Sequence, residues 1–246
     1  MKKLLLSAFV ICLAGTSIAQ ESPLWMRHCA LSPDGTTIAF TYKGDIYTVP
    51  STGGRATQIT TNPAFDTEPV WSPDSKQIAF ASDRMGSLDV FVVSSEGGAP
   101  QRLTTHSGSE KPVAYKDNKH ILFTANIAPS AEDAGFPSGQ FQQVYEVAVT
   151  GGRPAMFSSM PMECISINKE GVMLYQDKKG YEDYWRKHQK SPIARDIWML
   201  RPGQTPRYEK QTTFTGEDRE PVWAPDGKSF YYLSEENGTF NVYQRT

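Results

Sequence analysis

The sequence predicts an all-β protein, a β-propeller built from four-stranded antiparallel blades. Two observations lead to this fold: a turn phrase that recurs along the chain, and a second phrase, with a glycine pair, that follows it. With 19 Gly and 17 Pro in 246 residues, the chain is far from the composition of disordered or collagen-like proteins. The alternative, a β-sandwich without internal repeats, would leave the repetition unexplained.

The first phrase appears three times in clear form. Residues 68–82 and 220–234 both begin Glu-Pro-Val-Trp, and residues 31–40 repeat the core Ser-Pro-Asp-Gly with the hydrophobic run after it. Weaker copies lie at 111–123 and 166–175. Ser-Pro-Asp-Gly suits a type I turn, because the fixed φ of proline fits its second position. The aspartates of these turns are expected to accept hydrogen bonds from their own turn's backbone; they are Asp34, Asp74, Asp117 and Asp226.

The second phrase is a short apolar strand, a glycine pair and a strand that ends in threonines. The pairs are Gly53-Gly54, Gly97-Gly98 and Gly151-Gly152, and Pro202-Gly203 replaces the pair in the fourth copy. Two glycines permit the positive φ angles of a tight hairpin turn. Hydrophobic runs such as 78–81 do not alternate with polar residues, which is typical of strands buried on both faces. One repeat therefore predicts four short antiparallel strands.

The spacing of the phrases indicates propeller blades. Pro33 and Pro73 are 40 residues apart, and Gly53 and Gly97 are 44 apart, within the ~40–45 residues of a four-stranded blade. The last repeat lacks a glycine pair, so about four and a half blades of an incomplete ring are expected in residues 20–246. The expected blades lie near 27–62, 63–106, 107–158, 159–214 and 215–246, with insertions near 124–141 and 177–195.

Residues 1–19 predict a signal peptide. Lys2 and Lys3 precede an apolar stretch, and Ser17-Ile18-Ala19 places small residues before a cleavage point. The alternative, a buried N-terminal helix, does not explain this order of features. We therefore expect export, most simply to a bacterial periplasm. After residue 20, no apolar stretch approaches the ~20 residues of a membrane span.

Charge and motif content argue against several function classes. The chain carries 25 basic and 27 acidic residues, without the cationic surplus that is usual for a nucleic-acid partner. It contains no nucleophile elbow, zinc-protease or phosphate-loop motif, and its four histidines lack metal-ligand spacing. The sequence therefore predicts no catalytic residue, metal site or cofactor. Cys29 and Cys164 are the cysteines of the expected mature chain, and the sequence leaves open whether they pair.

The phrase Trp-Ser-Pro-Asp-x-x-x-Ile-Ala-Phe resembles the PD40 (WD40-like) repeats of the propellers in TolB and in tricorn-type proteases. Residues 179–188, together with 194–198, are similar to an insertion in a middle blade of tricorn-type propellers. The resemblance implies a six-bladed, substrate-gating N-terminal propeller of an exported serine peptidase of the S41 family.

The same resemblance implies that a second propeller, a PDZ-like domain and the catalytic domains follow. The chain is then a fragment and is expected to be inactive. Its expected partners are peptides or unfolded polypeptide and its own missing C-terminal domains. Because an incomplete ring would expose apolar blade flanks, poor solubility or a homo-oligomer is also expected.

A basic cluster is the candidate substrate-binding site: Arg186, Lys187 and His188. An arginine there could bind the C-terminal carboxylate of a peptide through two parallel hydrogen bonds; the alternative is a solvated loop. Tricorn-type propellers carry substrate-anchoring arginines in a loop of an early blade, but the matching residues 106–111 contain no arginine. Two other functions stay open: a TolB-like, non-enzymatic periplasmic binding propeller, and the propeller of a dipeptidyl-peptidase-like α/β-hydrolase.

Overall fold

The computed structural model describes residues 25–127, 141–180 and 191–246. These residues form five antiparallel sheets, four with four strands and the last with three. The predicted all-β fold with four-stranded antiparallel blades is confirmed. Blades 1 and 2 contain β1 (Arg27–Leu31), β2 (Thr37–Tyr42), β3 (Asp45–Pro50), β4 (Thr57–Gln58), β5 (Asp66–Trp71), β6 (Gln77–Ser82), β7 (Asp89–Ser94) and β8 (Gln101–Arg102). Blade 3 contains β9 (Lys111–Asp117), β10 (His120–Ala125), β11 (Gln143–Ala148) and β12 (Ala155–Ser158). Blades 4 and 5 contain β13 (Met162–Ile167), β14 (Met173–Asp177), β15 (Ile197–Arg201), β16 (Arg207–Lys210), β17 (Asp218–Trp223), β18 (Phe230–Ser234) and β19 (Asn241–Arg245).

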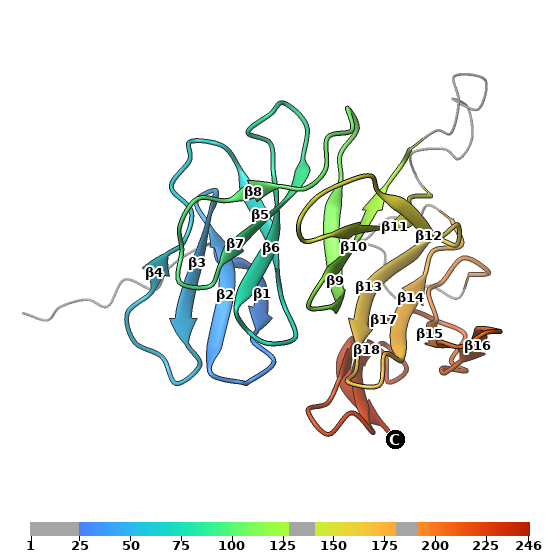
Figure 1. Ribbon diagram of the computed structural model, residues 1–246. Helices are drawn as coiled ribbons and strands as arrows, with labels where there is room; N and C mark the ends of the chain where they lie inside the picture. The colour runs from blue at the N-terminus through green and yellow to red at the C-terminus, as the bar shows by residue number, and fades with distance from the viewer. Residues whose placement is uncertain (1–24, 128–140, 181–190) are drawn as a thin grey trace, which may run out of the picture.

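The blades follow one another in chain order, as the colours of Figure 1 show. Within each blade the spatial order of the strands is also the chain order. The first strands of successive blades contact one another, and we call these five the inner strands: β1, β5, β9, β13 and β17. The described residues form five blades, the last with three strands. This differs from the six blades expected for this type of propeller and is slightly more than the four and a half expected in residues 20–246.

The turn phrases fold as the sequence predicts. The Thr36 N–H donates to Asp34 Oδ1 over 2.9 Å, and the same bond forms at Asp74, Asp117 and Asp226. The Ser32 hydroxyl also donates to Asp34, and together these bonds lower the pKa of that carboxyl group. The turn aspartates are therefore structural acceptors.

The glycine pairs adopt the positive φ angles that the sequence predicts for tight hairpin turns. Gly53 and Gly54 have φ angles of 86° and 125°, and the pairs at 97–98 and 151–152 repeat this geometry. Since the left-handed region is strained for residues with a Cβ atom, glycine is the residue that these hairpins require.

Hydrophobic cores lie between the blades. Each of the four interfaces between successive blades contains one cluster of buried side chains. Ile78, Ala79, Phe80 and Ala81 have no exposed surface, as expected for a strand covered on both faces. A blade is therefore stabilised mainly by its neighbours.

In three blades, a threonine that follows the fourth strand forms a hydrogen bond with the backbone of the third strand. The Val90 N–H donates to Thr104 Oγ1 over 2.9 Å, and equivalent bonds join Ile46 to Thr60 and Ile197 to Thr212. These hydroxyls are buried, so each satisfies a backbone N–H that water cannot reach.

Candidate functional site

The inner strands surround an axial channel, and each carries a β-bulge at the same register. In β5 the bulge falls between Thr67 and Val70, so that Glu68 and Pro69 together lie opposite one residue of β6. In the bulges of the other inner strands, two residues likewise lie opposite one residue of the neighbouring strand. The bulge places one side chain per blade at the channel wall; the set is His28, Glu68, Pro112, Cys164 and Glu220.

Four of these five bulge residues have a left-handed backbone. Their φ angles are 51° for His28, 55° for Glu68, 51° for Cys164 and 54° for Glu220. A residue with a Cβ atom rarely adopts this conformation, and it persists only where the surroundings impose it. The fifth position is Pro112, whose ring fixes φ near −65°. The strained residues are thus concentrated at the channel.

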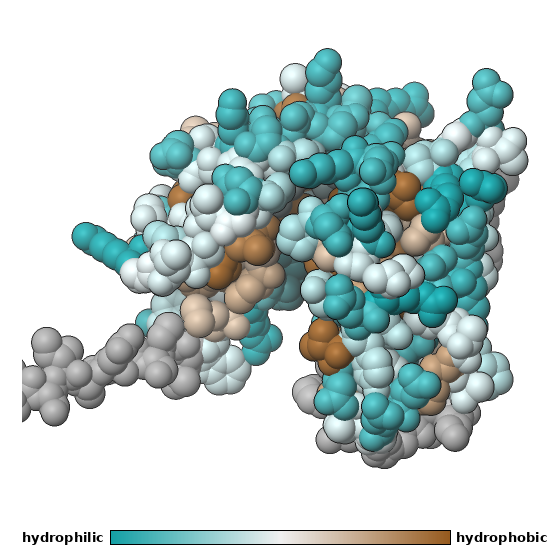
Figure 2. All heavy atoms as spheres, turned by 90° about the horizontal axis from the view of Figure 1, so that it is seen from below, coloured by the Kyte–Doolittle hydropathy of each residue, from teal (hydrophilic) through white to brown (hydrophobic). Residues whose placement is uncertain are grey.

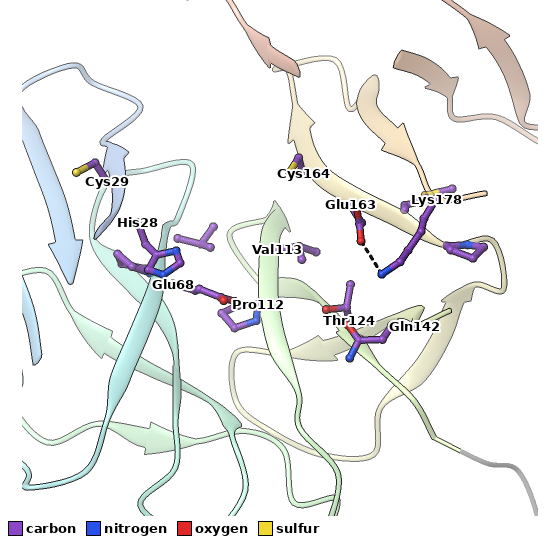
Figure 3. Close-up of a pocket in the computed structure, with 14 residues that line it drawn as sticks. His28, Cys29, Glu68, Pro112, Val113, Thr124, Gln142, Glu163, Cys164 and Lys178 are labelled. Carbon is purple, nitrogen blue, oxygen red and sulfur yellow. Dashed lines mark ion pairs between the residues drawn. The ribbon is translucent and has the colours of Figure 1, made fainter. Parts of the chain in front are cut away.

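Two adjoining cavities make up the channel. The first, of about 520 Å³, is lined by charged and polar side chains that include Glu68, Gln142, Glu163 and Lys178. Figure 3 shows these side chains gathered from separate blades around one opening. The second cavity, of about 560 Å³, is lined by all five inner strands. The two share Cys29, Pro69, Val70, Val113 and Cys164, so they are continuous.

Seen from below, the molecule is hollowed between two masses, with hydrophobic surface on both sides of the hollow (Figure 2). The second cavity accounts for such a surface, since its lining includes Leu31, Val113, Ile165 and Val222. Leu31 and Val222 are more than half exposed, at 58% and 55%. Large apolar side chains that remain exposed in a concave site are typical of ligand-binding surfaces.

Most charges at the channel are paired. Lys111 Nζ lies 2.7 Å from Glu68 Oε1, and Lys178 Nζ lies 3.0 Å from Glu163 Oε1. Arg195 contacts Glu163 and, over 2.8 Å, Glu217. Burial opposes ionisation of Glu163, but the hydrogen bonds from Lys178 and Gln176 outweigh it and lower the pKa of its carboxyl group.

The two cysteines of the channel are both free. Cys29 on β1 and Cys164 on β13 belong to blades on different sides of the opening (Figure 3). Both side chains reach solvent, yet the channel wall encloses Cys164 closely. This desolvation, together with the nearby carboxylates of Glu220 and Glu163, raises the pKa of the Cys164 thiol to about 12. The thiol is therefore protonated at neutral pH and is a poor nucleophile.

The basic cluster predicted from the sequence, Arg186, Lys187 and His188, lies outside the described residues. The channel residues Glu68 and Glu220 were not predicted as functional residues. Their signal was present in the sequence, because both begin a Glu-Pro-Val-Trp phrase, but the phrase alone does not reveal a bulge that faces a channel. In the described ranges there is no cluster of three or more metal-ligating side chains. None of the described residues forms a helix long and apolar enough to span a bilayer.

Comparison with known protein families shows which family this chain belongs to. Residues 23–246 match the family described as "Tricorn protease N-terminal beta propeller domain". The chain belongs to this family. It is 26% identical over 213 residues to "Tricorn protease homolog 1" of Streptomyces coelicolor, a match that covers 86% of this chain and 19% of that relative. The chain thus spans about a fifth of the length of this tricorn homologue, and likewise matches limited parts of other curated relatives.

Solved structures agree on the fold. The crystal structure of the tricorn protease superposes with a TM-score of 0.71 at 17% identity, over 91% of this chain and 21% of that one. A putative TolB from Agrobacterium tumefaciens gives a TM-score of 0.69 at 16% identity, over 91% of this chain and 77% of that one. Both tricorn-type and TolB-like propellers are therefore structural neighbours of this chain.

Proposed function

We propose that this chain is the substrate-gating propeller of an exported, tricorn-like serine peptidase. In this role it admits peptides or unfolded polypeptide through the axial channel, while catalysis takes place in other domains. The observation that carries the proposal is the continuous channel lined by all five inner strands, with paired charges in one cavity and exposed apolar side chains in the other. Family membership and the larger size of the tricorn relatives support it.

The channel walls suit an extended polypeptide. Prolines at the bulges, Pro69, Pro112 and Pro221, have no N–H to donate to a passing strand. A proline-blunted edge discourages stable β-pairing, so a chain in the channel would contact side chains more than backbone. Such contacts allow entry without permanent capture.

The test is to narrow the channel and measure peptide binding. Val113 lines both cavities, and Val113→Trp would place a large ring between them. We expect an unstructured, dye-labelled peptide to bind the Val113→Trp chain about fivefold more weakly than the wild-type chain, as judged by fluorescence anisotropy. Thr57→Trp, on the exposed outer strand β4, is the matched control and should change nothing. Equal binding to all three proteins would refute the channel as the peptide site.

Export to the periplasm is part of the proposal. It rests on the signal-peptide features of residues 1–19, which lie outside the described residues. Fusing residues 1–24 to a reporter that is active only after export would test it. Replacing Lys2 and Lys3 by glutamate should reduce export.

A second candidate, a TolB-like binding propeller, is favoured by the similarity to the putative TolB structure. In that role a face of the propeller would bind a folded envelope protein instead of a threaded peptide. The coding sequence beyond residue 246 distinguishes the two candidates: PDZ-like and S41 catalytic segments support the peptidase, and a stop after one more blade supports the binding propeller.

A further inference from the structure

Glu220 differs from the other channel glutamates in having no partner. Its side chain is exposed in the second cavity, and no cation or hydrogen-bond donor of the described residues contacts its carboxylate. Glu68, at the equivalent bulge position, is neutralised by Lys111 at 2.7 Å. Glu163 is neutralised by Lys178 at 3.0 Å and by Arg195. Glu220 is thus the one carboxylate among the described residues that line the second cavity, and it forms no ion pair there. The basic residues of that lining are Lys116, whose charge is paired with Glu146 at 2.7 Å, and Lys169.

The backbone that presents Glu220 is held firmly. The Glu220 N–H donates to Gln176 Oε1 over 2.8 Å, and Gln176 Nε2 donates to Glu163 Oε2 over 2.9 Å. The amide of Gln176 thus ties the bulge of β17 to β14 and to the paired carboxylate of β13. A charge on a fixed bulge is a better binding element than one on a loose loop, since less conformational entropy is lost when a ligand binds.

The surroundings of Glu220 combine negative charge with apolar surface. Ile165, Val222 and Val113 line the same cavity. Close by, the thiol of Cys164 is influenced more by the carboxylates of Glu220 and Glu163 than by the arginines of blades 4 and 5, which adds to the rise in its pKa. This combination fits a cationic group attached to an apolar chain.

Building on the proposed function, we propose that Glu220 binds a positively charged group of the peptide that enters the channel. The group is an ammonium, either the peptide's N-terminus or a lysine side chain. Its contact with Glu220 is a charge-assisted hydrogen bond, and the neighbouring apolar residues of the peptide lie against Ile165 and Val222. The channel then favours cationic over neutral peptides.

Three peptides of one uncharged, apolar-rich sequence, each with a C-terminal amide and a neutral dye, test this on the full chain. The first has a free N-terminus, the second is N-acetylated, and the third is acetylated with one internal lysine. We expect the wild-type chain to prefer the first or the third peptide over the second by about fivefold, as for a partly enclosed ion pair. Whichever of the two is preferred identifies the source of the ammonium group.

Glu220→Gln should abolish this preference without changing the binding of the acetylated, lysine-free peptide. Glu220→Asp, which keeps the charge, should retain part of it. Glu96→Gln, an exposed glutamate outside the channel, is the matched control and should behave like wild type. Thermal melting of each variant shows that the fold is intact.

The outcomes separate this inference from the proposed function. If wild type binds all three peptides equally, or if Glu220→Gln keeps the preference, the role of Glu220 is refuted while the channel can still be the peptide site. If none of the peptides binds the wild-type chain, both proposals are refuted.

Discussion

Blades 2 and 5 share nearly the same inner-strand sequence, Asp-Thr-Glu-Pro-Val-Trp and Asp-Arg-Glu-Pro-Val-Trp, but they differ in burial. In blade 2 the second strand, β6, is buried from Ile78 to Ser82. In blade 5 the corresponding strand, β18, is buried only at its ends, Phe230 and Ser234, and the three residues between them are exposed or partly exposed. Ala79 is 0% exposed, whereas its counterpart Tyr231 is 40% exposed.

The difference arises from neighbours and not from local geometry. Both blades carry an aromatic pair across their second and third strands at the same register: Phe80 with Phe91, and Tyr232 with Tyr243. The ring centroids are 5.9 Å and 5.8 Å apart. Blade 2 packs between blades 1 and 3, and blade 5 contacts blade 4. Similar inner strands and a matching aromatic pair therefore come with unequal burial, and we expect blade 5 to be the less stable because the hydrophobic contribution depends on what covers the blade.

Truncating the aromatic pair should give the largest effect. Phe80→Ala removes a fully buried ring and leaves a cavity between blades, so we expect it to lower the free energy of unfolding by about 3–5 kcal/mol. Tyr232→Ala, at the matching position of blade 5, should cost about 1–2 kcal/mol because this side chain is only partly buried. Urea denaturation measures both values. Equal losses would mean that blade 5 is covered in solution by another surface.

The ion pair of blade 2 should give the next largest effect. Arg84 Nη2 lies 2.9 Å from both carboxylate oxygens of Asp66, and both side chains are nearly buried. Asp66→Asn leaves the guanidinium without its counter-charge, and we expect a loss of about 3 kcal/mol in the free energy of unfolding. The double variant Asp66→Asn with Arg84→Met should recover part of this loss. A double variant as unstable as the single one would show that the pair is not coupled.

Turns, glycine pairs and blade spacing could be predicted from the sequence because each depends on a few neighbouring residues. Ser-Pro-Asp-Gly and Gly-Gly set local φ angles, and their recurrence sets the period. The weak third copy is an exception, because its first residue, Lys111, does not match Glu68, the first residue of the second copy. Lys111 pairs with Thr124 of the second strand of its blade, and Thr67 pairs with Ala81 at the same position of blade 2. Lys111 therefore matches Thr67, one residue before Glu68.

The channel site was less predictable. Glu68 and Glu220 each precede a proline, a position that normally favours an extended backbone, and their positive φ angles are imposed by the bulge and by strand packing. Lys111, which neutralises Glu68, lies 43 residues away in the sequence, and Gln176, which accepts from the backbone N–H of Glu220, lies 44 residues away. Such pairings follow from the order of the blades around the axis, which a repeat count does not specify.

The smallest expected effect on stability concerns the aspartate that begins the inner strand of blade 5, Asp218. Asp218 in blade 5 matches Asp66, but Glu236 occupies the place that Arg84 has in blade 2. Burial raises the pKa of Asp218, and the carboxylates of Asp196 and Glu236 add to the rise. Because the folded state favours the protonated acid, the contribution of Asp218 to stability is complete below the unfolded pKa of 3.8 and is lost as pH rises through the higher folded value.

Asp218→Asn should therefore stabilise the protein at pH 7, by about 1 kcal/mol, and flatten the fall of stability above pH 4. Asp226→Asn is the control with the opposite sign, since hydrogen bonds from the backbone of Lys228 and Ser229 lower the pKa of Asp226. Its carboxylate stabilises the fold above pH 3.8, and this contribution is lost as pH falls through the lower folded value. Urea denaturation between pH 3 and pH 8 measures both variants. If Asp218→Asn destabilised the fold at neutral pH, Asp218 would have a cationic partner, and the contrast between blades 2 and 5 would rest on packing alone.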